Sequence, residues 1–180
     1  PNEKDKDSVM KVVNLLNDSL SELRVIIDDR SEVSPGFKFN EWEQKGVPLR
    51  VEVGPKDIEK NTILVSRRDD ESKNSYPMDD VQNTIKKLLN EIQDNLYKNS
   101  ENTLKDNTTH VESLSELIEV LNSKKGFVSC FWKENKEDEL KVKEETSATL
   151  RCYPLENTET EKSVNSDSEN GKFAIFSKAY

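Results

Sequence analysis

The sequence predicts an α/β protein of two domains, and three observations lead to this fold class. Its 180 residues suffice for two small domains that each bury a modest core. Only 32% of the residues are hydrophobic while 35% are charged, so the cores must be thin, as in short layers of helices and strands. Apolar residues recur with helical spacing in some segments and alternate in others, and the polar stretch 99–109 separates two such regions. We therefore expect a first domain over 1–105 and a second over 106–180.

The first domain should alternate helices with strands. Apolar residues three and four positions apart indicate an amphipathic helix over 9–23, and the β-branched run 24–27 predicts a buried strand. Pro35-Gly36 is a turn signal before a short helix that ends at Gly46. The other elements expected here are a strand over 49–53, a helical turn near Ile58, a strand over 62–66 and a long helix over 79–96.

The second domain should again mix helices with strands. Ser113 and Glu116 form a capping-box pattern at the start of a helix that stops before Gly126. Residues 156–170 contain no large hydrophobic residue except Val164, so we expect a mobile loop there. The other elements expected are a strand over 127–132, a charged helix over 136–145, a strand over 149–153 and a last strand over 173–176. The apolar layer expected to hold this domain together consists of Phe127, Phe131, Leu150 and Phe173.

The charge of the chain argues against a protein that coats nucleic acid by bulk electrostatics. The formal net charge is −9. Residues 24–68 hold nine Lys or Arg against eight Asp or Glu, a net of +1, so the rest of the chain carries −9 − 1 = −10. Any contact with RNA must therefore be local.

Cysteine content and hydropathy further narrow the class of protein. Cys130 and Cys152, with a single histidine in the chain, fit neither a zinc motif nor a disulfide framework, which favours a reducing cytoplasm. No stretch is long enough for a membrane span, and the N-terminal residues lack the apolar region of a signal peptide. Because the chain begins at Pro1 rather than Met, we expect it to be a piece of a longer protein.

Charged residues gather around the predicted strands between Phe39 and Asp69, where alternation puts Arg50 and Glu52 on one face. Glu43 offers a carboxylate that can accept the N1–H and N2–H of an unpaired guanine, and Arg50 and Lys56 can donate to its O6 and N7. The alternative is a set of solvated surface charges whose ion pairs contribute only about 0–1 kcal/mol. The pattern alone leaves both interpretations open.

The resemblance of three segments to a known family favours the RNA interpretation. The segments are VIIDDR (25–30), KGVPLRVEVGPKD (45–57) and FSKAY (176–180). Together they resemble the anticodon-binding region and C-terminal extension of prolyl-tRNA synthetases, and the resemblance covers nearly all of the chain. It implies a mixed β-sheet flanked by helices, the anticodon-binding fold of class II synthetases, with its first strand missing here, followed by a small α+β domain. A missing strand would leave an unpaired sheet edge.

The resemblance also implies which residues bind RNA. Proline anticodons end in two guanines, which the trio Glu43, Arg50 and Lys56 would read. Further basic residues that would approach the anticodon loop are Arg67, Arg68 and Lys73.

Neighbouring residues receive less specific roles. An aromatic side chain on the short helix could stack on a base or fill the core. We expect Phe39 to fill the core, and for Trp42 we leave both roles open. The resemblance implies that three residues shape the loop near the anticodon site and are not catalytic: Asp28, Asp29 and Arg30.

In the C-terminal extension, many relatives bind zinc between four cysteines. Here Cys130 lies near a ligand position and Cys152 does not match one, so we expect no metal site. His110 is expected to be a polar linker residue. Tyr180 resembles the terminal aromatic residue of the family, which implies docking against the catalytic domain.

The resemblance therefore implies the C-terminal region of a proline–tRNA ligase, which attaches proline to tRNA(Pro) in an ATP-dependent two-step reaction. This region would recognise the anticodon, while the catalytic residues, ATP and Mg would belong to an upstream domain of a cytoplasmic homodimer. One alternative is a free-standing RNA-binding or regulatory module with the same fold, which has no need of Tyr180. Another is an acidic protein-interaction adaptor, for which neutralising Arg50 and Lys56 would leave tRNA binding unchanged.

Overall fold

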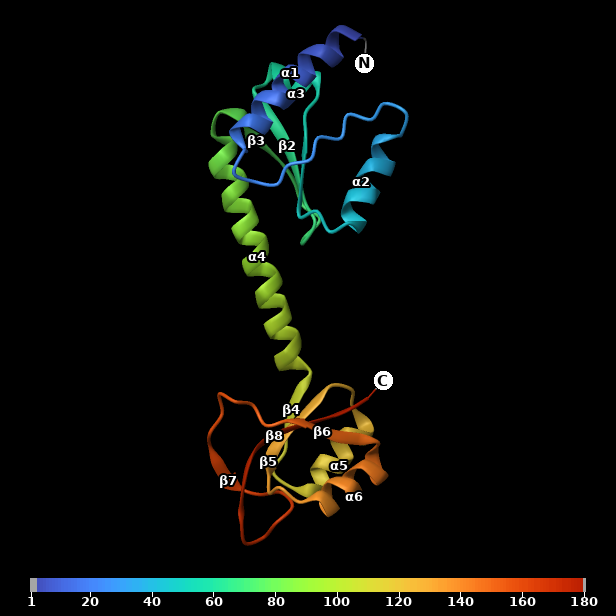
Figure 1. The fold of residues 1–180 in the computed structure, drawn as a ribbon, viewed down its shortest axis with the longest axis vertical. Helices are drawn as coiled ribbons and strands as arrows, with labels where there is room; N and C mark the ends of the chain where they lie inside the picture. The colour runs from blue at the N-terminus through green and yellow to red at the C-terminus, as the bar shows by residue number, and fades with distance from the viewer. Residues whose placement is uncertain (1–2, 180) are drawn as a thin grey trace. The chain divides into compact units, whose positions relative to one another are not determined.

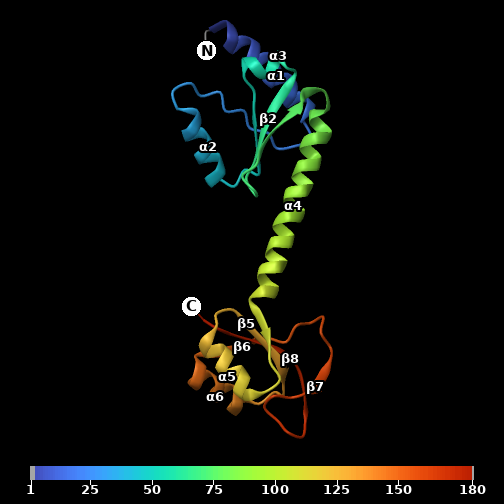
Figure 2. The same cartoon turned by 180° about the vertical axis from the view of Figure 1, so that it is seen from behind.

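The computed structural model describes residues 3–179, with side chains from residue 6 onward. The described chain forms two compact units that divide between Asn99 and Ser100, each with its own sheet and helices (Figures 1 and 2). The division falls within the long helix α4 (Val81–Asp106), which also contains the boundary predicted near residue 105. The α/β class with helices flanking β-sheets is confirmed, and the sheet of the second unit is mixed.

A three-stranded antiparallel sheet, in the order β1-β2-β3 among the described residues, forms the centre of the first unit. Its strands are β1 (Leu49–Glu52), β2 (Thr62–Arg67) and β3 (Lys73–Pro77). The helices around it are α1 (Glu3–Ser19), α2 (Pro35–Gln44), α3 (Pro55–Glu59), the short η1 (Met78–Asp80) and the beginning of α4. β3 was not expected, because its sequence, KNSYP, has no run of apolar residues.

One face of this sheet is buried and the other carries polar side chains. Ile63 and Val65 of β2 are 0% and 1% exposed. They pack with Leu20, which follows α1, and with three residues of α4, namely Val81, Ile85 and Leu88. Because side chains alternate along a strand, Arg50 and Ser66 point to the opposite face. Figures 1 and 2 both place α2 and α4 on opposite sides of β2.

The strand predicted over 24–27 is wrong. Residues 24–30 have no regular structure, and Ile26 is 66% exposed. A β-branched run becomes a strand only where a neighbouring strand pairs with it. None of the described strands does so, and β1 lies at an edge of its sheet.

A five-stranded mixed sheet forms the second unit, with β4, β5, β8 and β6 in that order and β7 paired to β8. The strands are β4 (Thr108–His110), β5 (Phe127–Trp132), β6 (Ala148–Cys152), β7 (Thr160–Lys162) and β8 (Asn170–Lys178). β4 and β5 are parallel, and the other pairs are antiparallel. Helices α5 (Leu114–Ser123) and α6 (Lys136–Thr146) lie side by side on this unit (Figures 1 and 2).

The core of the second unit differs from the predicted aromatic layer. Trp132 and Phe176 are 0% exposed, and their rings meet at 4.9 Å between centroids. The residues that pack with them include Leu117, Leu121, Val128, Cys130, Val142 and Ala174. Alternation along β5 and β8 turns Phe131 and Phe173 to the other face, where their rings pack against each other at 5.6 Å. Of the predicted layer, Leu150 does pack against this core. The prediction took the wrong face of β5 and β8 for its phenylalanines and left out Trp132 and Phe176.

Two further expectations for this unit need correction. Residues 156–170, expected as a mobile loop, include β7 and the buried Ser163. Asn165 fixes the segment, because its Oδ1 accepts the backbone N–H of Lys133 at 2.9 Å. His110 belongs to β4 rather than to a linker, and its ring stacks on Phe173 at 6.1 Å.

Candidate nucleic-acid interface

A row of polar side chains crosses the open face of the first sheet. Arg50 of β1 lies opposite Ser66 of β2, and Ser66 lies opposite Lys73 of β3. The Nη2 atom of Arg50 donates to Ser66 Oγ at 3.2 Å. On the same face, Glu52 accepts hydrogen bonds from Arg50 Nε at 3.1 Å and from Lys73 Nζ at 3.1 Å. Strand alternation and antiparallel register therefore bring two cations and a carboxylate together.

Helix α2 adds a second carboxylate and an aromatic ring. Glu43 Oε1 accepts a hydrogen bond from Arg50 Nη1 at 2.5 Å. The guanidinium carbon of Arg50 lies 3.9 Å from the centroid of the Phe39 ring. Phe39 and Glu43 are four residues apart, so one helix face presents both. The expectation that Phe39 fills a core is wrong, because its half-buried ring lies under Arg50 instead.

The hydrogen bonds of this cluster favour the ionised form of Glu52. Burial raises the pKa of Glu52, but the hydrogen bonds from Lys73 and Arg50 outweigh this effect and hold it below its ordinary value. The side chain of Glu43 is 52% exposed. An ionised carboxylate can only accept hydrogen bonds, and its two oxygens offer more acceptor sites than Arg50 occupies. Glu43 can therefore receive two further N–H groups from solvent or from a ligand.

Lys56 does not join the pair formed by Glu43 and Arg50. It lies exposed on α3, beyond the end of β1, and no hydrogen bond or ion pair links it to that pair among residues 6–179. The structure thus brings together two members of the predicted trio. Lys73 takes the second cationic position beside Arg50.

The side chain of Arg67 bonds outside this cluster, and Arg68 lies just beyond the end of β2. Arg67 lies on the helix-covered face, where its Nη2 is 2.8 Å from Asp69 Oδ2 and its Nη1 is 3.0 Å from Glu91 Oε2 of α4. Its side chain is 14% exposed, so these ion pairs give it a structural role. Arg68 is exposed just after β2, and its backbone N–H donates to the carbonyl of Pro48 at 3.0 Å.

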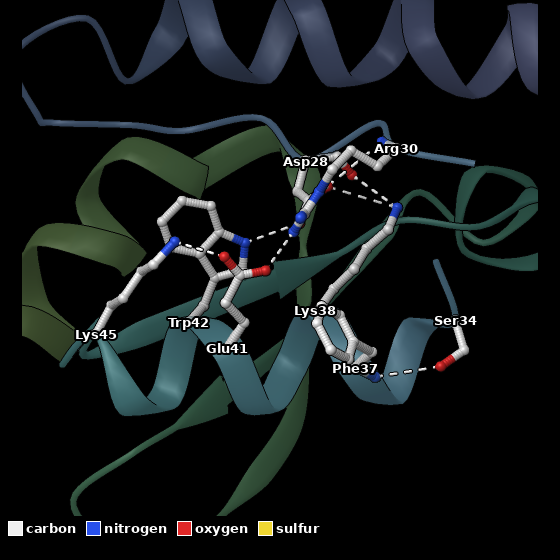
Figure 3. A network of polar contacts seen from close by, with 8 residues as sticks. All are labelled: Asp28, Arg30, Ser34, Phe37, Lys38, Glu41, Trp42 and Lys45. Atoms are coloured by element: carbon white, nitrogen blue, oxygen red, sulfur yellow. Dashed lines mark hydrogen bonds and ion pairs between the residues drawn. The ribbon is translucent and has the colours of Figure 1, made fainter. Parts of the chain in front are cut away.

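Asp28 and Arg30, in the segment before α2, form one hydrogen-bonded network with Trp42 of that helix (Figure 3). Trp42 Nε1 donates to Asp28 Oδ2 at 2.8 Å, and Arg30 forms two side-chain hydrogen bonds with the same carboxylate. Trp42 therefore lies against Asp28 and Lys45 rather than in the core. Asp29 is exposed.

The two cysteines lie in the second unit and take no part in this cluster. Cys130 is buried, which raises the pKa of its thiol to about 12, and Cys152 is exposed; both are free. Within the described part of the chain, no group of three or more His, Cys, Asp or Glu side chains is arranged to hold a metal ion. The same residues include no helix with the length and apolar character of a membrane span. Tyr180, the predicted docking residue, lies outside the described residues.

Comparison with known families divides the chain in the same way as the two units. Residues 1–88 match the family model "Anticodon binding domain", and residues 114–180 match "Prolyl-tRNA synthetase, C-terminal". The proline–tRNA ligase of Roseiflexus sp. (strain RS-1) is 40% identical over 184 residues, covering 99% of this chain and 38% of that protein. The chain belongs to the prolyl-tRNA synthetase family.

Other relatives of known name agree. Proline–tRNA ligase 2 of Clostridioides difficile (strain 630) is 39% identical over 178 residues, covering 97% of this chain and 37% of that protein. The crystal structure of prolyl-tRNA synthetase from Cryptosporidium parvum with L-proline and AMP superposes with a TM-score of 0.84 at 34% identity, over 95% of this chain and 37% of that one. The chain thus spans less than two fifths of the length of the prolyl-tRNA synthetases that it matches.

All predicted RNA-binding residues of this prolyl-tRNA synthetase region lie within the segment that matches the anticodon-binding model. Sequence reasoning placed Glu52 beside Arg50 but gave it no role in the site, and it missed Ser66. Alternation already placed Glu52 beside Arg50, and this was the available signal. Ser66 had none, because only the register of β1 against β2 places it there.

Proposed function

We propose that this chain is the anticodon-recognising region of a proline–tRNA ligase. The observation that carries the proposal is the Glu43–Arg50 pair on an open sheet face, inside the segment matched by the anticodon-binding model. Glu43 would accept N1–H and N2–H of an unpaired guanine, and Arg50 would donate to an adjacent acceptor. Lys56, Arg68 and Lys73 would contact the RNA at the edges of this site, with Arg67 holding β2 against α4.

The full-length protein would activate proline with ATP and Mg and then transfer it to tRNA(Pro). Its catalytic residues and its ATP site would lie outside this chain, in the part that the longer relatives possess. We further propose that the enzyme is a cytoplasmic homodimer, that the two domains are 1–105 and 106–180, that the second binds no zinc, and that Tyr180 docks against the catalytic domain.

The substitution Glu43→Ala in the full-length enzyme tests the proposed role. We expect kcat/KM for tRNA(Pro) to fall about tenfold to a hundredfold, since a base-edge contact contributes about 1–3 kcal/mol. Proline-dependent ATP–pyrophosphate exchange should stay nearly unchanged, because that reaction needs no tRNA. Aminoacylation and exchange are measured on the same preparations.

Glu59→Ala is the matched control, because Glu59 is an exposed glutamate of α3 in the same unit. It should leave both reactions unchanged. Equal losses of exchange and aminoacylation in Glu43→Ala would contradict anticodon recognition. An absence of any ligase activity in the full-length protein would favour a free-standing RNA-binding module.

A further inference from the structure

Helix α2 carries Glu43 and Phe39 but has little apolar anchoring of its own. None of its residues is buried, and Phe37 is 57% exposed. Its ends are well defined: Ser34 Oγ caps the N-terminus by accepting Phe37 N–H at 3.3 Å, and Gly46 follows the C-terminus with a φ of +84°. Caps set the length of a helix but not its orientation, so other contacts must orient α2 against β1.

Polar contacts from another side of α2 reach the segment before the helix. The side chains of Lys38, Glu41, Trp42 and Lys45 recur at helical spacing and face away from the stripe of Phe39 and Glu43. Figure 3 shows Lys38, Glu41 and Trp42 reaching Asp28 and Arg30. Lys45 lies over the Trp42 ring and bonds to Glu41. α2 is therefore held from two sides, by Arg50 at one and by the Asp28–Arg30 segment at the other.

Asp28 is the centre of this network. Its Oδ1 accepts Arg30 Nε at 2.9 Å, and its Oδ2 accepts Arg30 Nη2 at 2.7 Å and Trp42 Nε1 at 2.8 Å. Lys38 Nζ lies 3.6 Å from Oδ1 and donates to the Asp28 carbonyl at 3.3 Å. Arg30 Nη2 extends the network to Glu41 Oε2 at 2.8 Å. The carboxylate is 14% exposed, and hydrogen bonding from Arg30 holds its pKa well below the ordinary value.

We propose that Asp28 is a positioning residue for guanine recognition: it orients α2 so that Glu43 and Phe39 meet Arg50 before RNA binds. The proposal rests on the proposed function of Glu43. A site whose supporting contacts are formed in advance spends less binding free energy on ordering, and binds more tightly for that reason. Asp28 touches no RNA in this scheme and acts through Trp42, Arg30 and Lys38.

Two variants of the full chain test this role. Asp28→Asn removes the charge, and Trp42→Phe keeps an aromatic ring while removing the Nε1–H donor to Asp28. Asp29→Asn is the control, since it removes an equal charge from an exposed neighbour. Circular dichroism and thermal unfolding verify that each variant is folded, and Trp42→Phe serves if Asp28→Asn is not.

The binding probe is an anticodon stem-loop RNA of tRNA(Pro), compared with the same RNA carrying inosine in place of each anticodon guanine. Inosine lacks the N2–H that Glu43 would accept. We expect the unaltered chain to bind the inosine RNA about tenfold more weakly, as one charge-assisted hydrogen bond requires. In Asp28→Asn this ratio should fall to about twofold or less, with Trp42→Phe in between, while Asp29→Asn keeps the original ratio.

A second readout, hydrogen exchange of the α2 amides, needs no RNA. Asp28→Asn and Trp42→Phe should speed exchange in α2 and leave β2 unchanged. Unchanged exchange together with an unchanged inosine ratio would overturn the positioning role. If the unaltered chain itself did not distinguish inosine from guanine, the proposed function and its positioning residue would both be refuted, and faster α2 exchange would then report only a structural tie.

Discussion

Arg50 shows at the scale of one residue why arginine suits the centre of this site. Its guanidinium contacts Glu43, Glu52 and Ser66 through separate nitrogens while its flat face lies on Phe39. A planar group with five fixed donors can satisfy several acceptors at once and still stack on a ring. A lysine has one point charge and no flat face, so it cannot reproduce this arrangement.

Asp69 links the stability of the first unit to acid pH. Its side chain is 1% exposed and accepts hydrogen bonds from Arg67 at 3.1 and 2.8 Å and from Asn95 at 2.8 Å. The hydrogen bonds from Arg67 lower the pKa of Asp69 to about 2, against the opposing effect of burial. The ordinary pKa of an aspartate in an unfolded chain is about 3.9. The ionised carboxylate therefore stabilises the fold above about pH 4, and this stabilisation is lost as the pH falls through about 2.

The substitution Asp69→Asn should remove this dependence. We expect the free energy of unfolding near neutral pH to fall by about 1–2 kcal/mol, because Arg67, which is 14% exposed, loses the most buried of its carboxylate partners. Between about pH 4 and pH 2 the variant should lose less stability than the unaltered chain. Urea denaturation at several pH values measures both effects. Asp94→Asn, at an exposed position on α4, should change neither, and an equal pH slope in the Asp69 variant would refute the linkage.

At the scale of elements, helices and strands whose own residues carry a sustained apolar pattern were predictable. Segments whose structure depends on pairing with a neighbour were not. The helix over 79–96 and the strand over 127–132 appear as α4 and β5, because each carries its pattern internally. The run 24–27 has the composition of a strand but no partner, while β3 has a poor composition and pairs with β2. In the site, Arg50 and Glu52 followed from alternation, whereas the place of Phe39 depends on how α2 meets β1.

Gly126 is an element-scale constraint in the second unit. Its φ is +114°, and a Cβ there would lie 2.3 Å from the Asn107 carbonyl oxygen, which accepts the N–H of Phe127 at 2.8 Å. We expect Gly126→Ala to destabilise this unit by about 2–4 kcal/mol, from backbone strain and from the loss of this contact at the start of β5. Thermal unfolding measures the effect. Gly36→Ala is the control, because a Cβ there has nothing within 4 Å, and equal unfolding midpoints for the two variants would contradict the prediction.

At the scale of the whole molecule, the acidic chain restricts how RNA can bind. The net charge is −9, while residues 24–68 carry +1 by the count of nine basic against eight acidic residues. Arg50 and Arg67 are already paired with carboxylates. The exposed cations of the candidate interface are thus few: Lys56, Arg68, and Lys73, which is itself bonded to Glu52. Under the proposed function, specific hydrogen bonds to bases would supply much of the affinity.

The salt dependence of binding should reflect these few cations. Neutralising about three phosphates predicts that log Kd rises with log salt concentration with a slope of about 2. Lys56→Ala should lower that slope by about 0.7, and Lys124→Ala in the second unit should leave it unchanged. Stem-loop titrations between about 50 and 300 mM salt measure it. A slope above about 5 would show broad electrostatic binding instead.

The unequal burial of the two cysteines has a practical consequence. Cys130 lies at 0% exposure in the core of the second unit, whereas Cys152 is open to solvent at the end of β6. Electrophiles react with accessible thiolates, so alkylating reagents select one sulfur in the native chain. A fluorophore can therefore be attached at a single natural position, without removing any residue on which folding depends.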